Sequence, residues 1–126
     1  AIVCYYRRQQ PLEPMKKIVA YIRPIVKERV VERLRRLRVP GASLMDVDGF
    51  GLEADATGQA SYDEQVSPYV RKIRLEVVCD DDRIREIAEA IAAAGQTGRR
   101  GDGKVFITPV EESIDIRTFQ EEESSG

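Results

Sequence analysis

The chain has 126 residues, a formal net charge of −2 and no histidine. This length suits one domain with a hydrophobic core. The near balance of acidic and basic residues argues against nucleic-acid binding. The absence of histidine excludes most general-base, catalytic-triad and zinc sites. Cys4 and Cys79 lie too far apart in the sequence for a metal motif or a disulfide framework. Because no apolar run approaches the ~20 residues of a membrane span and "AIVCYY" lacks the features of a signal peptide, we expect a cytoplasmic protein.

The first half of the chain predicts two strands and a helix after an N-terminal extension, residues 1–14. "KKIVAYIR" (Lys16–Arg23) is rich in β-branched and aromatic residues and stops at a proline, which predicts a strand. "VKERVVERLRRL" (Val26–Leu37) repeats apolar residues at helical spacing, and Pro40–Gly41 marks its end. "SLMDVDGF" (Ser43–Phe50) alternates apolar and polar residues, as a second strand does.

The second half begins with a long loop. Residues 51–68 are small, polar and acidic with no consistent period, and a loop of that length is usually functional or disordered. "YVRKIRLEVVC" (Tyr69–Cys79) predicts a third strand, "DDDRIREIAEAIAAAG" (Asp80–Gly95) a second helix, and "GKVFITPVEE" (Gly103–Glu112) a fourth strand. Residues 119–126 form an acidic tail that we expect to be disordered.

The order of these elements, β-α-β-β-α-β, predicts the fold class. With right-handed crossovers it gives a ferredoxin-like α+β domain, in which four antiparallel strands carry both helices on one face. The other face would then be bare. A bare face that carries valine, isoleucine and tyrosine predicts an oligomer that buries it.

The stretch "TGRRGDGK" (Thr97–Lys104) admits two interpretations. Its glycines would let backbone N–H groups turn toward an anion, with Lys104 as a point charge on a phosphate and Arg99 or Arg100 as further cations. It is not a Walker A loop, because Val105 follows the lysine and a strand follows the loop. Spacing alone leaves open whether the stretch is a phosphate cradle or a plain turn.

Five motifs together resemble the PII signal-transduction family. They are "MKKIVAYIRP", "GFG" at the start of the long loop, "KIRLEVV" after it, "QTGRRGDGKVF" and "IRT". They occur in the order and spacing of that family, and the resemblance covers residues 15–118 without a gap. The TG-x-x-GDGK-[IV]-F stretch is specific to the family and favours the phosphate cradle.

The resemblance implies a fold, a ligand and a way of working. PII proteins are homotrimers of ferredoxin-like subunits that bind ATP or ADP in clefts between subunits, with Mg²⁺ possible beside ATP. They report energy and nitrogen or carbon status without catalytic turnover. Their long T-loop, here about residues 51–69, changes shape with the ligand and grips a target protein, often a membrane transporter.

The nucleotide-binding residues of the family can be carried over position by position. The resemblance assigns Gly101–Lys104 and Arg117 to the phosphates. It assigns Gly49–Gly51 to the base of the T-loop, and the remaining three positions to adenine and ribose. The complete set is Ser43, Gly49, Phe50, Gly51, Glu76, Val78, Gly101, Asp102, Gly103, Lys104 and Arg117.

Other positions depart from the family pattern. Lys72 matches the lysine that helps bind 2-oxoglutarate, although it could equally be a surface charge, and Glu53 replaces a glutamine that ligates Mg²⁺ and orients 2-oxoglutarate. A carboxylate there could still hold Mg²⁺ but would repel a dicarboxylate. Leu52 and Asp115 replace basic residues near the phosphates. We therefore expect a preference for ADP or AMP over ATP and weak or absent 2-oxoglutarate binding.

The sites of covalent modification depart as well. Gln65 stands where many bacterial members carry a modifiable tyrosine, and Asp63 where others carry a modifiable serine. Neither residue can be uridylylated or phosphorylated there. By analogy alone, such a divergent member could instead regulate inorganic-carbon (bicarbonate) metabolism.

Two further functions remain as alternatives. A slow ATPase would need a group that positions water beside a metal-bound phosphate, and Glu53 with Lys104 is the only candidate pair. A purely structural trimer would use the fold as an assembly module, and nucleotides would then neither stabilise it nor change its affinity for a partner.

Overall fold

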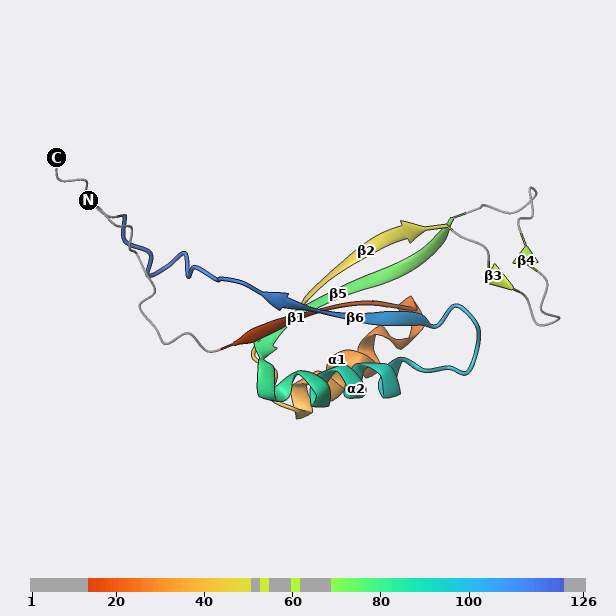
Figure 1. Ribbon diagram of the computed structural model, residues 1–126. Helices are drawn as coiled ribbons and strands as arrows, with labels where there is room; N and C mark the ends of the chain where they lie inside the picture. Colours follow the sequence, from red (N-terminus) through yellow and green to blue (C-terminus); the bar gives the residue numbers. More distant parts are fainter. Residues whose placement is uncertain (1–13, 51–52, 55–59, 62–68, 122–126) are drawn as a thin grey trace.

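The computed structural model describes residues 14–50, 53–54, 60–61 and 69–121 (Figure 1). Two helices lie on one side of a four-stranded sheet, and a separate pair of two-residue strands lies in the predicted T-loop. The elements in chain order are β1 (Met15–Ile22), η1 (Pro24–Val26), α1 (Lys27–Arg36), β2 (Ser43–Gly49), β3 (Glu53–Ala54), β4 (Ala60–Ser61), β5 (Val70–Asp80), η2 (Asp81–Arg83), α2 (Ile84–Gly95) and β6 (Gly103–Val110).

The sheet has the order β2-β5-β1-β6, and every neighbouring pair is antiparallel. The two central strands, β1 and β5, place Ile18 opposite Val77, and β6 places Ile107 on the other side of Ile18. This order and the two helices on one face confirm the ferredoxin-like βαββαβ fold.

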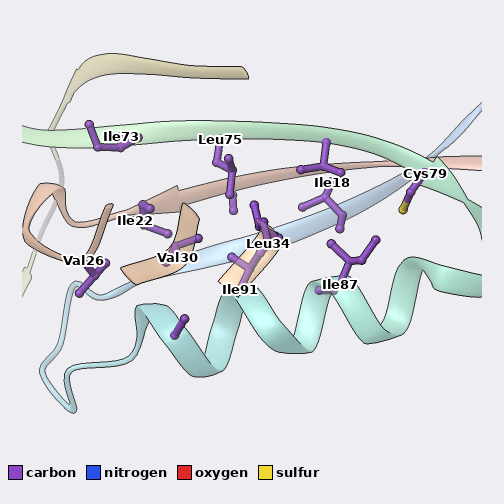
Figure 2. Close-up of a cluster of buried hydrophobic side chains, with 14 residues drawn as sticks. Ile18, Ile22, Val26, Val30, Leu34, Ile73, Leu75, Cys79, Ile87 and Ile91 are labelled. Atoms are coloured by element: carbon purple, nitrogen blue, oxygen red, sulfur yellow. The ribbon is translucent and has the colours of Figure 1, made fainter. Parts of the chain in front are cut away.

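The core lies between the sheet and the helices (Figure 2). Alternate residues of β1 and β5 point toward the helices, as the period of two in a strand requires. Ile18 and Leu75 from the strands are fully buried, and so are Val30 of α1 and Ile87 and Ile91 of α2. The helical periodicity of the sequence thus reports the faces that pack on the sheet.

The end of α1 differs from its predicted position. The helix ends at Arg36, before Pro40–Gly41, because Arg38 adopts a left-handed conformation with φ 58°. The N–H of Val39 donates to the carbonyl of Leu34 at 3.1 Å and that of Arg38 to Arg35 at 2.9 Å. This is a Schellman ending in which arginine occupies the position that glycine usually takes.

Other boundaries also shift slightly. β1 and β5 are each displaced by one residue from the predicted strands, β2 ends one residue early and β6 two residues early, and both helices begin with a short 3₁₀ turn. Two strands, β3 and β4, form within the stretch that was expected to be loop, where no sequence period signals them. Residues 1–13 and 122–126, which hold most of the predicted extension and tail, lie outside the described residues.

The face of the sheet opposite the helices is uncovered within the described part of the chain (Figure 1). It carries Tyr21 edge-on against Phe106, with ring centroids 6.4 Å apart, and the Arg74 guanidinium lies 5.9 Å from the centroid of Tyr21. Arg74 also pairs with Glu76 at 2.7 Å. The open face is therefore partly apolar, as the sequence predicted, but it also carries charged side chains, and the isoleucines Ile18, Ile22 and Ile73 lie in the core instead.

Candidate functional site

The loop after α2, together with the first two residues of β6, is called here the phosphate loop (Thr97–Lys104) and is organised around one carboxylate. Asp102 Oδ2 accepts hydrogen bonds from the backbone N–H groups of Thr97 at 2.8 Å and Gly98 at 3.0 Å. Its Oδ1 accepts from the Thr97 hydroxyl and from Arg23 Nε, the latter at 2.8 Å. The side chain of Asp102 therefore ties together both ends of the loop and the end of β1.

These contacts keep Asp102 ionised. The Thr97 hydroxyl, then the Arg23 guanidinium and the Thr97 and Gly98 amides, hold the pKa of Asp102 well below its usual range. Because all these donors face the carboxylate, its oxygens are already occupied within the loop. Asp102, which the family resemblance assigns to the phosphate-binding stretch, organises that stretch by holding its backbone.

Glycine is required at the point where the loop enters β6. Gly101 and Gly103 have φ values of 87° and 115°, in the left-handed region that other residues avoid. A Cβ on Gly103 would lie 1.7 Å from the carbonyl oxygen of Tyr21, inside the backbone of β1. The glycines of "GDGK" thus serve the curvature of the loop and its close approach to the neighbouring strand.

Two cations, one of β5 and one just after β1, hold carbonyls of the same loop. Arg23 Nη2 donates to the Arg100 carbonyl at 2.5 Å, and Lys72 Nζ, from β5, donates to the Gly101 carbonyl. Lys72, which the resemblance links to 2-oxoglutarate, therefore contacts the phosphate loop directly. The sequence interpretation assigned Arg23 no role, although it lies within the family motif "MKKIVAYIRP" and one residue before Pro24 at a strand end.

Lys104 is the second residue of β6 and lies opposite Tyr21, on the open face of the sheet. Its side chain is exposed. Within the described ranges, no carboxylate forms an ion pair with it. Its ammonium group can therefore meet an anion beside the loop without first giving up a partner.

The residues predicted to contact adenine and ribose lie elsewhere on the open face. Ser43 of β2 is the cross-strand partner of Glu76, and Val78 lies two residues further along β5 on the same face. β2 and β6 are the opposite edges of the sheet, so three strand spacings, ~14 Å, separate Ser43 from the edge that carries Lys104.

The predicted base of the T-loop lies at the end of β2. Gly49 is the last residue of that strand, opposite Val70 of β5. The Phe50 side chain is 70% exposed, and its ring meets Tyr69 edge-on at a centroid distance of 6.4 Å. Phe50 and Tyr69 thus form an exposed aromatic pair where the chain leaves and re-enters the sheet.

Arg117 lies beyond the far end of β6. The chain after β6 leads away from the sheet, on the side opposite the phosphate loop (Figure 1). The Asp115 carboxylate accepts the Arg117 N–H at 3.1 Å and so caps the turn that carries Arg117. The neighbouring Ile116 is 92% exposed. A single chain therefore does not bring Arg117 and Lys104 together.

The remaining predicted positions are only partly described. The backbone of Glu53 lies in β3, whereas Gly51, Leu52, Asp63 and Gln65 fall outside the described residues. In the ranges that the structure covers, no three histidine, cysteine or acidic residues gather as metal ligands would. Among those same ranges, no helix has the length and apolar character to cross a membrane.

Comparison with known proteins identifies the family of the chain. The family model described as "Nitrogen regulatory protein P-II" matches residues 15–120. Nitrogen regulatory proteins P-II from Azospirillum brasilense and Cereibacter sphaeroides are 40% and 41% identical over 104 residues, which are 82% of this chain and 93% of each relative. That of Nostoc punctiforme is 38% identical over the same length. The chain therefore belongs to the P-II family of nitrogen regulatory proteins and is a PII-like signalling regulator.

Proposed function

We propose that this PII-like regulator binds ADP or ATP through the phosphate loop and works as a homotrimer. The observation that carries the proposal is the loop itself: Asp102 fixes its backbone, glycines at positive φ curve it, and Lys104 forms no ion pair with any residue in the part of the chain that the structure describes. Such a loop offers backbone N–H groups and a cation to phosphate oxygens. With no histidine in the sequence, binding without turnover is the function that it suits.

The scattered positions of the matched residues favour a site shared between copies. Lys104 is at one edge of the sheet, Ser43 is at the other, and Arg117 lies on a segment beyond the sheet. When the open faces of several copies meet, an edge of one sheet approaches the opposite edge of the next. The exposed Ile114 and Ile116 on the C-terminal segment are suited to pack against such a neighbour.

The T-loop is the proposed output element. It starts after Gly49 and returns at Tyr69, close in the fold to Lys72, whose ammonium holds the Gly101 carbonyl. A nucleotide on the phosphate loop can therefore favour one T-loop arrangement over another, provided it binds the two with different affinity. A target protein, such as a membrane transporter, would bind one T-loop arrangement more tightly than the other.

The substituted positions set the expected ligand preference. Leu52 and Asp115 stand where typical members carry basic residues, so the most highly charged nucleotide loses the most attraction. We expect ADP or AMP to bind more tightly than ATP, and Glu53 to weaken 2-oxoglutarate binding while still allowing Mg²⁺. A response to bicarbonate is the alternative second signal.

Isothermal titration with AMP, ADP and ATP–Mg²⁺, each with and without 2-oxoglutarate or bicarbonate, tests this proposal. ADP should bind, and Lys104→Ala should weaken it by about tenfold or more, since a charge-assisted contact is lost. Lys27→Ala, on the first turn of α1, is the control and should bind ADP like the natural protein. Absence of binding by every nucleotide would leave only the structural trimer, and steady ADP release abolished by Lys104→Ala would support the ATPase.

A further inference from the structure

We infer that Arg23 is a positioning residue for nucleotide phosphates: it fixes the backbone of the phosphate loop and neutralises the carboxylate at its centre. The inference rests on the proposed nucleotide-binding function. It concerns a residue outside the loop, directly after β1. Arg23 need not touch the nucleotide to act in this way.

The Arg23 side chain makes two different contacts with the loop. Its Nε donates to Asp102 Oδ1 at 2.8 Å and its Nη2 to the Arg100 carbonyl at 2.5 Å. Both side chains of the ion pair are only partly accessible to solvent, with 23% of Arg23 and 21% of Asp102 exposed. The planar guanidinium can make both contacts at once because its donors form a fixed fork.

The backbone of Arg23 is itself well fixed. It follows the last residue of β1 and precedes Pro24, whose ring restricts its own φ and favours an extended residue before it. Arg23 accordingly has φ −72° and ψ 144°. Its carbonyl accepts the Val26 N–H at 3.1 Å. The guanidinium therefore extends from a rigid point rather than from a loop.

The contacts on carbonyl groups decide where the amide groups of the loop point. In a planar trans peptide the C=O and the following N–H point in opposite directions. The Arg100 carbonyl faces Arg23 and the Gly101 carbonyl faces Lys72. The N–H groups of Gly101 and Asp102 are consequently directed away from these cations, which leaves them to form an anion-binding nest.

Charge gives Arg23 a second role. Asp102 places a negative charge inside a loop that is proposed to hold phosphates, and an unpaired carboxylate there would repel them. The Arg23 guanidinium lies against that carboxylate and offsets its charge. Losing Arg23 should therefore weaken the binding of the phosphates of the nucleotide and leave the binding of its nucleoside part unchanged.

The test compares a ligand with phosphates and one without. Titration of ADP into Arg23→Ala should give a dissociation constant raised about tenfold, because a charge-assisted contact and the loop geometry are both lost. The stabilisation by millimolar adenosine, read as a shift in Tm, should match that of the natural protein. Arg23→Lys keeps the charge but loses the forked donors of the guanidinium, so its affinity for ADP should lie between those of the natural protein and Arg23→Ala.

Arg83→Ala is the matched control. Arg83 also donates to one backbone carbonyl, that of Leu37 at 2.7 Å, and to one carboxylate, that of Glu86 at 3.0 Å. It lies after β5, at the other end of the sheet from the phosphate loop. Removing it should leave the affinity for ADP unchanged, which separates a local role of Arg23 from the general loss of an arginine.

Two results would overturn the inference. One is a folded Arg23→Ala protein that binds ADP as tightly as the natural protein. The other is an Arg23→Ala protein whose affinity for ADP and for adenosine falls by the same factor. If Arg23→Ala does not fold, Arg23→Lys and Thr97→Val, which removes another donor to Asp102, carry the same comparison. Failure of the natural protein to bind ADP would instead refute the proposed function.

Discussion

At the scale of single residues, the "GDGK" stretch illustrates what the sequence can predict. Its spacing alone left a phosphate cradle and a plain turn both open, and the resemblance to the PII family favoured the cradle, with Lys104 expected on a phosphate. The stretch could not reveal that the Asp102 carboxylate faces Thr97 and Gly98, or that Arg23 lies against it. Those contacts depend on the end of β1 approaching the loop, which only the packed fold brings about.

The ionised state of Asp102 predicts a pH-dependent contribution to stability. Its pKa is lowered in the fold, so the stabilisation is complete above the unfolded value of about 3.9 and is lost as the pH falls below that toward the folded pKa. The Tm difference between the natural protein and Asp102→Asn should thus be larger at pH 7 than at pH 3. Thermal unfolding followed by circular dichroism at both pH values measures it, and a difference independent of pH would contradict the role of the charge.

Gly103 offers a steric prediction. Alanine at this position would place its Cβ 1.7 Å from the Tyr21 carbonyl oxygen while retaining a φ of 115°. Because the neighbour is backbone, β6 must shift, and we expect a loss of at least about 1–3 kcal/mol in unfolding free energy. Urea unfolding measures this loss. Gly41→Ala, whose Cβ would have nothing within 4 Å, is the control, and equal stability of the two variants would refute the prediction.

At the scale of elements, the regular pattern was predictable and its ends were not. Apolar residues at helical spacing in the first predicted helix marked the face that packs in the core, where Val26, Val30 and Leu34 are buried, because burial on one face imposes a period. The Schellman ending at Arg38 escaped detection since arginine rarely adopts a left-handed φ. The pairing of β3 with β4 escaped too, because two-residue strands have no period to detect.

The packing of α2 on the sheet makes Ile91 a test of the core. Ile91 is fully buried between α2 and the central strands (Figure 2). Ile91→Ala should lower the free energy of unfolding by about 2–5 kcal/mol through lost burial and the cavity left behind. Glu89→Ala changes an exposed residue of the same helix that pairs with Arg85 at 3.9 Å and should cost far less. Urea unfolding compares them, and similar losses would contradict this packing.

At the scale of the whole molecule, one chain holds the parts of the proposed site but does not assemble them. The family motifs identified Arg117 from the sequence, whereas its place beyond β6 came from the structure. The bare sheet face was predictable from the order of the elements. The ion pair between Arg74 and Glu76 on this face was not predictable, because such charges usually stay solvated rather than pair. These features together favour a nucleotide site between copies.

The measurement that tests this central claim most directly is ADP binding by mixed oligomers. Lys104→Ala and Arg117→Ala chains, each weak in ADP binding alone, are refolded together and titrated with ADP. If one copy supplies Lys104 and its neighbour Arg117, random pairing restores about a quarter of the sites to full affinity. If both residues act within one copy, each copy of the mixture still carries one defect, and no site of full affinity should appear.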